Sequence, residues 1–405
     1  MLKFIKARSI GYIVKHVAVS PFVLLLWLTI EITNLFRPVF IVGLSYKGRI
    51  THYMVPMELH LRNANRLNEN YLIIFVMPAA TPNEAVRTVY RRHAIIIDSH
   101  FPNFTRRTFS ILAVLLKSRF TPDLPNWQEL WQLEPATTLT NDELKFGEEL
   151  LEILGIPKGA QYVCLGVKEA AYYKSITPDR GYGQDLRHES SDSKNVNIEN
   201  YMAAATYLAE QGIYVVRVGS VVGAPLPNDR HPMIIDYATT YRSELGDITL
   251  GAFCKFFICG CTGSVFFAAI RKKPSVMADY YFETDPRSRN YRLDQLPNSI
   301  LITRMYKKKD GNFLNFEEII SANKSLLTDR ALEDLELNPI PNSPEEILDL
   351  VSEMNLRLDN SFVASQKYEE LQNGFYDCFD PPIKWLEYPL MRVASSFLRK
   401  HQDLL

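Results

Sequence analysis

Short apolar runs alternate with helical patterns along this chain of 405 residues, and the alternation occurs twice. In the first half, residues 38–44, 71–77 and 94–98 are typical of buried strands, with helical patterns at 52–65 and 83–93. Strands that are apolar throughout and alternate with helices indicate a parallel sheet covered on both faces. The sequence therefore predicts an α/β fold.

The pattern restarts in the second half of the chain. A single core rarely grows past about 250–300 residues, so we expect two α/β domains. Open α/β sheets bind ligands at the carboxyl ends of their strands, which predicts a cleft where the two domains face each other. The expected strands are 162–167, 214–219, 233–236, 256–260 and 275–278, and the expected helices are 141–154, 198–211 and 247–254.

Two stretches stand apart from this pattern, and the whole chain divides into four expected segments. Residues 121–138 are rich in Pro and Trp and are expected to form a loop, and the polar stretch 173–197 is long enough to be functional or mobile. We expect residues 1–36 to form a basic and apolar helical segment, residues 37–157 the first domain, residues 158–358 the second domain and residues 359–405 a helical tail.

The first 36 residues join basic side chains to a short apolar run. The uncharged run 17–30 is shorter than the ~18–20 residues that a spanning helix needs, and no small-residue cleavage site follows it. We expect residues 1–36 to form an interfacial helix on the inner face of the membrane, with the protein cytoplasmic and peripheral. The alternative is an apolar arm packed on the protein's own core. A net charge of −1 gives no general attraction to nucleic acid.

Residues 256–270 read as a buried strand, a turn of small residues and an apolar helix. Thr262, Gly263 and Ser264 would place bare backbone N–H groups at a helix N-terminus. Unsatisfied amides and the helix dipole both favour an anion there, so the turn is a candidate site for phosphate. The alternative is a tight turn whose small residues serve packing alone.

Arg49 and His52 follow the first expected strand, where the cleft should lie. His52 would stand in the first turn of a helix, where the neutral imidazole is favoured, and it could take a proton from an acceptor hydroxyl. It could equally be a surface or capping histidine.

Lys168 and Glu169 follow the first strand of the second domain. Lys168 could meet phosphate as a point charge, and Glu169 could bind a sugar hydroxyl or act as a base. The alternative is an ion pair on the surface, which would contribute little.

Arg217 interrupts a strand that is otherwise apolar. A buried arginine needs an anionic partner, because an unpaired buried charge costs several kcal/mol. The partner is either the phosphate of a donor or a carboxylate of the fold, and Asp236 and Asp247 are the candidate carboxylates. Both interpretations stay open at this point.

Several catalytic motifs are absent from the sequence. The chain has no Walker-type phosphate loop, no Gly-x-Gly-x-x-Gly after a strand and no Gly-x-Ser-x-Gly, which disfavours an NTPase, a dinucleotide oxidoreductase and a hydrolase. It also lacks Asp-x-Asp, and Cys259-x-Cys261 has no second ligand pair at zinc spacing. We therefore expect no metal and no cofactor, with phosphate neutralised by Arg, Lys and helix amides.

The chain resembles a group of bacterial glycosyltransferases found among surface-polysaccharide genes, which are similar in turn to GT-B fucosyltransferases. The resemblance runs from about residue 39 to about residue 358. It is carried by residues 48–52, 58–59, 163–172, 197–201, 212–219, 234–238, 247–258, 342–347 and 353–354.

The resemblance implies two Rossmann-like domains of the GT-B type and a nucleotide-sugar donor held mainly by the second one, without metal. The donor-side residues would be Lys168, Arg217 and Asp247, with the 262–264 turn at the phosphates, and Arg49 and His52 would face the acceptor. The family's strand often ends in His-Val-Arg-Asp, and residues 166–169 read Gly-Val-Lys-Glu instead.

The sequence therefore predicts a glycosyltransferase that moves a sugar from a nucleotide-sugar donor to a cell-surface glycan or lipid-linked acceptor. His52 and Glu169 are the candidate catalytic residues. Two alternatives stay open: a nucleotide-sugar epimerase of the same shape, and a non-catalytic partner in a polysaccharide assembly complex.

Overall fold

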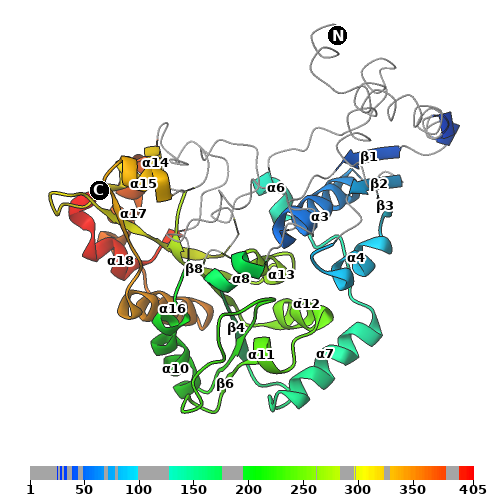
Figure 1. The fold of residues 1–405 in the computed structure, drawn as a ribbon, viewed down its shortest axis with the longest axis horizontal. Coiled ribbons are helices and arrows are strands. Elements are labelled where there is room, and N and C mark those ends of the chain that lie inside the picture. The colour runs from blue at the N-terminus through cyan, green and yellow to red at the C-terminus, as the bar shows by residue number, and fades with distance from the viewer. Residues whose placement is uncertain are drawn as a thin grey trace, which may run out of the picture.

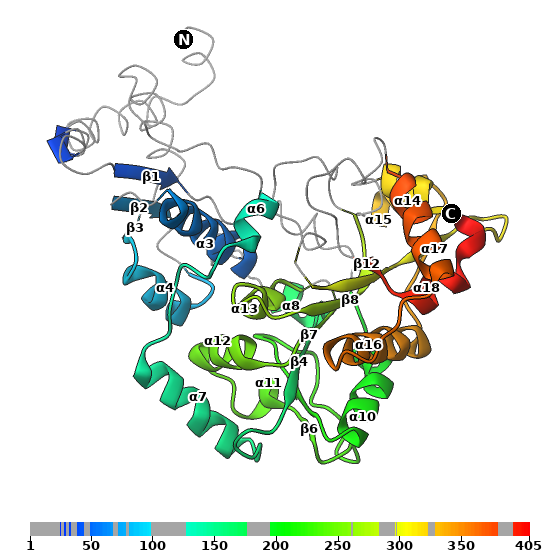
Figure 2. The same ribbon diagram turned by 180° about the vertical axis from the view of Figure 1, so that it is seen from behind.

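The computed structural model shows a mixed α/β protein built on two parallel sheets (Figures 1 and 2). The described residues are 25, 28–29, 32–33, 39–43, 49–67, 72–77, 81–98, 127–175, 195–260, 262–282, 296, 298–322, 329–379 and 392–405. Most of the expected membrane-surface segment, most of the polar stretch 173–197, and Cys261 lie outside them.

The smaller sheet has the order β1-β2-β3, with all strands parallel. Its strands fall where the apolar runs predict them, and Asn83 caps the second helix by accepting a hydrogen bond from the N–H of Val86. We call this sheet with its two helices the N-terminal unit. Its elements are β1 (Val39–Gly43), α3 (Ile50–Arg66), β2 (Leu72–Met77), α4 (Glu84–Arg91) and β3 (Ile95–Asp98).

Two helices connect the sheets. One is α6 (Trp127–Gln132), which lies where we expected a loop, so that prediction is wrong for these residues. Leu130 and Trp131 are fully buried. Their packing stabilises a helix that the local sequence pattern does not predict. The other is α7 (Asn141–Ile153), which begins at a capping box formed by Thr140 and Glu143.

The larger sheet has seven parallel strands and forms, with its helices, the C-terminal unit. The apolar runs of the second half predict five of its strands. Across the sheet the order is β12 (Arg392–Val393), β9 (Ile300–Thr303), β8 (Ser275–Tyr280), β7 (Phe257–Gly260), β4 (Tyr162–Val167), β5 (Tyr214–Arg217) and β6 (Ile234–Ile235).

Helices cover both faces of the larger sheet. Figures 1 and 2 place α10 and α16 on one side and α7, α12 and α13 on the other. The helices around this sheet are α8 (Ala170–Ser175), the 3₁₀ helix η3 (Ile198–Tyr201), α10 (Met202–Glu210), α11 (Tyr237–Thr240), α12 (Glu244–Phe253), η4 (Gly263–Val265), α13 (Phe266–Ala269) and α16 (Pro344–Leu358).

The last part of the chain returns to the larger sheet. The described part of residues 359–405, expected to be a helical tail, supplies two α-helices, a 3₁₀ helix and also β12, which pairs with β9. A small antiparallel ribbon, β10 with β11, precedes α16. The elements are β10 (Met305–Lys307), α14 (Phe316–Ala322), α15 (Asp329–Asp334), β11 (Asn338–Ile340), α17 (Gln366–Asp377), α18 (Ser395–Lys400) and η8 (Gln402–Leu404).

The two units pack through their helices. The start of α3 contacts η4, the body of α3 contacts α13, and α4 packs on α12. None of the helices in the part of the chain that the structure describes is both long and apolar enough to cross a membrane. The expected domain boundaries and the cleft stay predictions.

Candidate functional site

The turn after β7 leads directly into a helix, as the sequence predicts. Thr262, Gly263 and Ser264 are half-buried, and the 3₁₀ turn η4 continues into α13. Thr262 stands at the N-cap but makes no side-chain capping bond, and its N–H donates to Cys259 Sγ at 3.3 Å. The first turn holds no acidic residue. The turn thus presents a helix N-terminus without a negative side chain of its own.

The first turn of α3 lies against this turn. A side chain at position 263 would collide with Thr51 and with Ile50, which shows how closely Gly263 approaches α3. Arg49 is the N-cap of α3, again without a side-chain capping bond, and His52 is exposed in the same turn. Two helix N-termini therefore stand side by side, and neither has an acid in its first turn.

The end of β4 adjoins the same turn. Val167 is in register with Gly260, the last residue of β7. A Cβ at position 166 would lie 2.8 Å from Ser264 Oγ and 2.9 Å from the ring of Phe257, so β4 packs closely on the turn at Gly166. Lys168 follows, half-buried, and its carbonyl accepts the N–H of Val196 at 3.0 Å. Lys168 and the turn therefore share the carboxyl edge of the larger sheet.

Arg217 is 1% exposed and contacts two carboxylates. Its Nη2 lies 2.6 Å from Glu169 Oε1, its Nη1 lies 3.3 Å from Asp236 Oδ2, and Nη1 also donates to the carbonyl of Ala224 at 2.7 Å. Of the two carboxylates that the sequence offered, Asp236 is a partner and Asp247 is not. Glu169, the candidate base or sugar-binding residue, is the closer partner of Arg217.

These carboxylates also hold the loop after β5. Glu169 Oε2 accepts the N–H of Gly223 at 2.6 Å, and Asp236 Oδ2 accepts the N–H of Leu226 at 2.8 Å. Both oxygens of Glu169 are thus engaged, one by a cation and one by an amide. A carboxylate bound in this way orients a loop better than it accepts a proton.

Asp247 lies in the first turn of α12, a helix that packs on α4, α7 and α13. Its Oδ2 accepts from Arg242 Nη2 at 2.9 Å. Burial raises the pKa of the Asp247 carboxyl to about 6, against the opposing effect of Arg242. Asp247 is therefore paired with Arg242, and not with Lys168 or Arg217.

The structure also has a buried polar cluster at the ends of β8 and β9 that the sequence pattern did not single out. Asp279 is 1% exposed, accepts the N–H of Asn342 at 2.9 Å and lies 3.3 Å from Arg304. Tyr201 donates to the other oxygen of Asp279 at 3.4 Å, and its hydroxyl also lies against Gly260. Asp279 interrupts an apolar strand just as Arg217 does, so the same reasoning could have found it.

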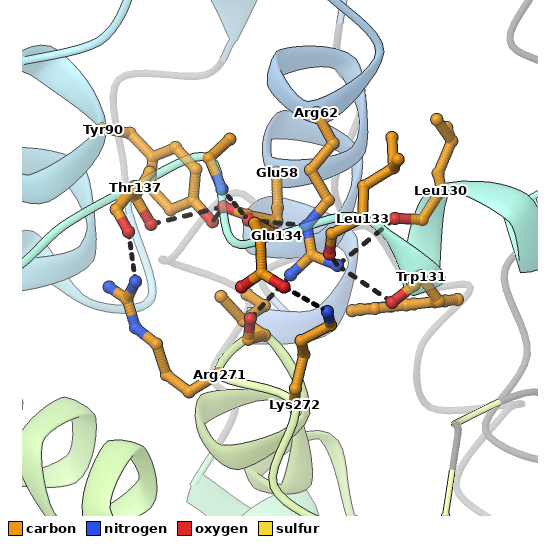
Figure 3. A network of polar contacts seen from close by, with 12 residues as sticks. Glu58, Arg62, Tyr90, Leu130, Trp131, Leu133, Glu134, Thr137, Arg271 and Lys272 are labelled. Atoms are coloured by element: carbon orange, nitrogen blue, oxygen red, sulfur yellow. Dashed lines mark hydrogen bonds and ion pairs between the residues drawn. The ribbon is translucent and has the colours of Figure 1, made fainter. Parts of the chain in front are cut away.

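A second buried network joins α3 to both α6 and the end of α13 (Figure 3). Glu58 and Arg62 are fully buried and form an ion pair at 2.9 Å. Tyr90 donates to Glu58 at 3.0 Å, and Arg62 donates to the carbonyl of Ile270 at 2.6 Å. Burial and the neighbouring Glu58 raise the pKa of the Tyr90 hydroxyl, so it stays a donor. The network fixes α3, and with it the turn that carries Arg49 and His52.

No protein-family model and no curated protein matches this sequence. Among solved structures, a family 9 glycosyltransferase from Veillonella parvula is 11% identical, with a TM-score of 0.43 over 80% of this chain and 98% of that one. The ADP-heptose LPS heptosyltransferase II of Escherichia coli is 12% identical, with a TM-score of 0.40 over 80% and 99%. An E. coli heptosyltransferase with ADP-2-deoxy-2-fluoro heptose is 14% identical, with a TM-score of 0.32 over 73% and 98%. This likeness is loose and carries no argument about function.

Proposed function

We propose that this protein is a glycosyltransferase that moves a sugar from a nucleotide-sugar donor to a cell-surface glycan or lipid-linked acceptor. The supporting observation is the meeting of two helix N-termini at Thr51 and Gly263, without an acid in either first turn. An anion at a helix N-terminus gains about 0.3–1 kcal/mol, and the proposal is that both termini act on the same anion. A diphosphate is the proposed ligand because it is anionic and accepts hydrogen bonds from amides.

The proposed roles use residues at the carboxyl edge of the larger sheet and in the first turn of α3. The diphosphate lies on the 262–264 turn beside Lys168, while Arg217 and Glu169 hold the neighbouring loop. His52 takes the proton of the acceptor hydroxyl, whose oxygen bonds to the anomeric carbon as the bond from that carbon to the diphosphate oxygen breaks. Helix amides and Lys168 stabilise the leaving nucleoside diphosphate, so the proposal needs no metal.

One observation favours the non-catalytic alternative. The glycosyltransferases that this chain resembles in sequence often have histidine where it has Gly166, and a Cβ at 166 would approach Ser264 Oγ at 2.8 Å and Phe257 at 2.9 Å. A side chain at this position would therefore need Ser264 and Phe257 to move. This difference from the family pattern is what supports the non-catalytic alternative.

The test is a transfer assay with a panel of sugar nucleotides. We expect release of nucleoside diphosphate that depends on a lipid-linked acceptor and persists in EDTA. Conversion of the sugar without release would indicate the epimerase. Nucleotide binding by thermal shift without turnover would indicate the non-catalytic partner, and absence of any nucleotide binding contradicts the proposed donor site.

We further propose that the N-terminal segment holds the protein on the inner face of the membrane. Leu25, Leu28 and Ile32 are helical in backbone and 65%, 45% and 55% exposed, and their spacing of three and four residues is that of one face of a helix. Replacing all three by aspartate should weaken binding to vesicles with anionic lipid by about 100-fold or more, because each side chain contributes up to ~1.5–3 kcal/mol when buried.

Vesicle flotation measures this effect. Val363→Asp is the matched control, because Val363 is apolar and 87% exposed but lies far along the chain after α16. Equal flotation of the triple variant and the wild type would contradict the membrane proposal.

A further inference from the structure

Each unit supplies a charged side chain that caps a helix of the other unit. In the N-terminal unit this side chain is Arg62, on α3. In the C-terminal unit it is Glu244, on α12. The charge has the favourable sign in both cases, because cations suit the C-terminal end of a helix and anions the N-terminal end.

Arg62 caps the end of α13 from inside the protein. Its Nη2 donates at 2.6 Å to the carbonyl of Ile270, the C-cap residue of α13. Its Nε pairs with Glu58, and the Nη1 donates to the carbonyls of Leu130, Trp131 and Leu133 at 3.1–3.4 Å. The guanidinium thus holds α3, the segment that links the units, and α13 at one point (Figure 3). Separating the units would remove a buried charge from these partners, which is costly.

Glu244 caps α4 from the other direction. Its Oε2 accepts the N–H of Glu84 at 2.6 Å and the N–H of Ala85 at 3.3 Å. Asn83 takes the N–H of Val86 at 2.8 Å and donates its own amide to the carbonyl of Glu244 at 3.2 Å. The first three amides of α4 are therefore all satisfied, and two of them depend on a residue of the other unit.

We propose that these reciprocal caps lock the two units in one orientation, so that the first turn of α3 stands against the 262–264 turn before any ligand arrives. Arg62 and Glu244 are positioning residues in this scheme. If the lock holds, the two units keep this orientation when the donor binds. Its catalytic consequence rests on the proposed function: losing a cap misplaces Arg49 and His52 while the donor turn stays intact.

Glu244→Ala is the sharpest test, because Glu244 is only half-buried and its loss should leave both cores folded. We expect hydrogen exchange at the amides of Glu84 and Ala85 to become about five- to tenfold faster. The acceptor KM should rise or kcat should fall, while the Kd for the donor stays unchanged. In the wild type, the radius of gyration from X-ray scattering should not change on adding UDP, GDP or ADP.

Glu84→Gln is the matched control. This change removes one negative charge from the first turn of α4, the turn that Glu244 caps. The Glu84 side chain itself is exposed and pairs with Arg87 of the same helix rather than with the other unit. Contraction of the wild type on binding a nucleotide, or equal exchange in Glu244→Ala and the wild type, would overturn the lock. A wild type that binds no nucleotide contradicts the proposed function alone, and the exchange measurement then decides whether the lock exists.

Discussion

Replacing Arg217 by methionine is expected to lower the free energy of unfolding by about 3–5 kcal/mol, the usual cost of breaking a buried ion pair from one side. The change leaves Glu169 and Asp236 without their cation, and both are largely buried. It also frees the carbonyl of Ala224 and loosens the loop that these groups hold. Urea denaturation followed by circular dichroism measures the loss.

A matched control is Lys255→Met. Lys255 also pairs with a carboxylate, that of Asp359 at 2.9 Å, but this partner is 48% exposed, so the loss should stay below about 1 kcal/mol. The double variant Arg217→Met with Asp236→Asn should recover part of the stability, since one stranded charge is removed. A stable Arg217→Met protein that no longer binds nucleotide would instead assign the guanidinium to the donor phosphate.

The fold was largely predictable where the signal is local. Strands such as Tyr162–Val167 are apolar throughout, and helix starts such as those at Asn83 and Ser343 carry their own capping residues. Helix α6 and strand β12 were not predictable in this way. The first is held by burial of Trp131 against Phe266, and the second is two residues long and exists only through its pairing with β9.

The positions of the candidate residues at strand ends were predictable from the sequence, but their pairings were not. An arginine inside an apolar strand signals a buried charge, and the sequence could only offer Asp236 and Asp247 as partners. The sheet order decides the matter, because β4 and β6 both adjoin β5 and so bring Glu169 and Asp236 to Arg217. The contact of Thr51 with Gly263 depends on how the two units pack, which no local pattern encodes.

The candidate base stands on a helix that is fixed at its other end. Arg62 and Glu58 anchor α3 to α6 and to the end of α13, three turns away from His52. The start of α3 in turn lies against Gly263, on the unit that would hold the donor. His52 can therefore be removed without disturbing the donor turn, which separates its chemical role from binding.

Replacing His52 by alanine is expected to lower kcat for transfer by about 10²–10⁴-fold, the usual contribution of a general base, with the Kd for the donor unchanged. The pH–rate profile should also lose the limb that reports the essential base. His60→Asn is the matched control on the same helix. Burial lowers the pKa of His60 to about 4, so it is neutral at working pH, and its loss should leave the pH–rate profile unchanged. A His52→Ala enzyme with wild-type kcat, or one whose pH profile matches that of His60→Asn, would show that the proton goes to another group.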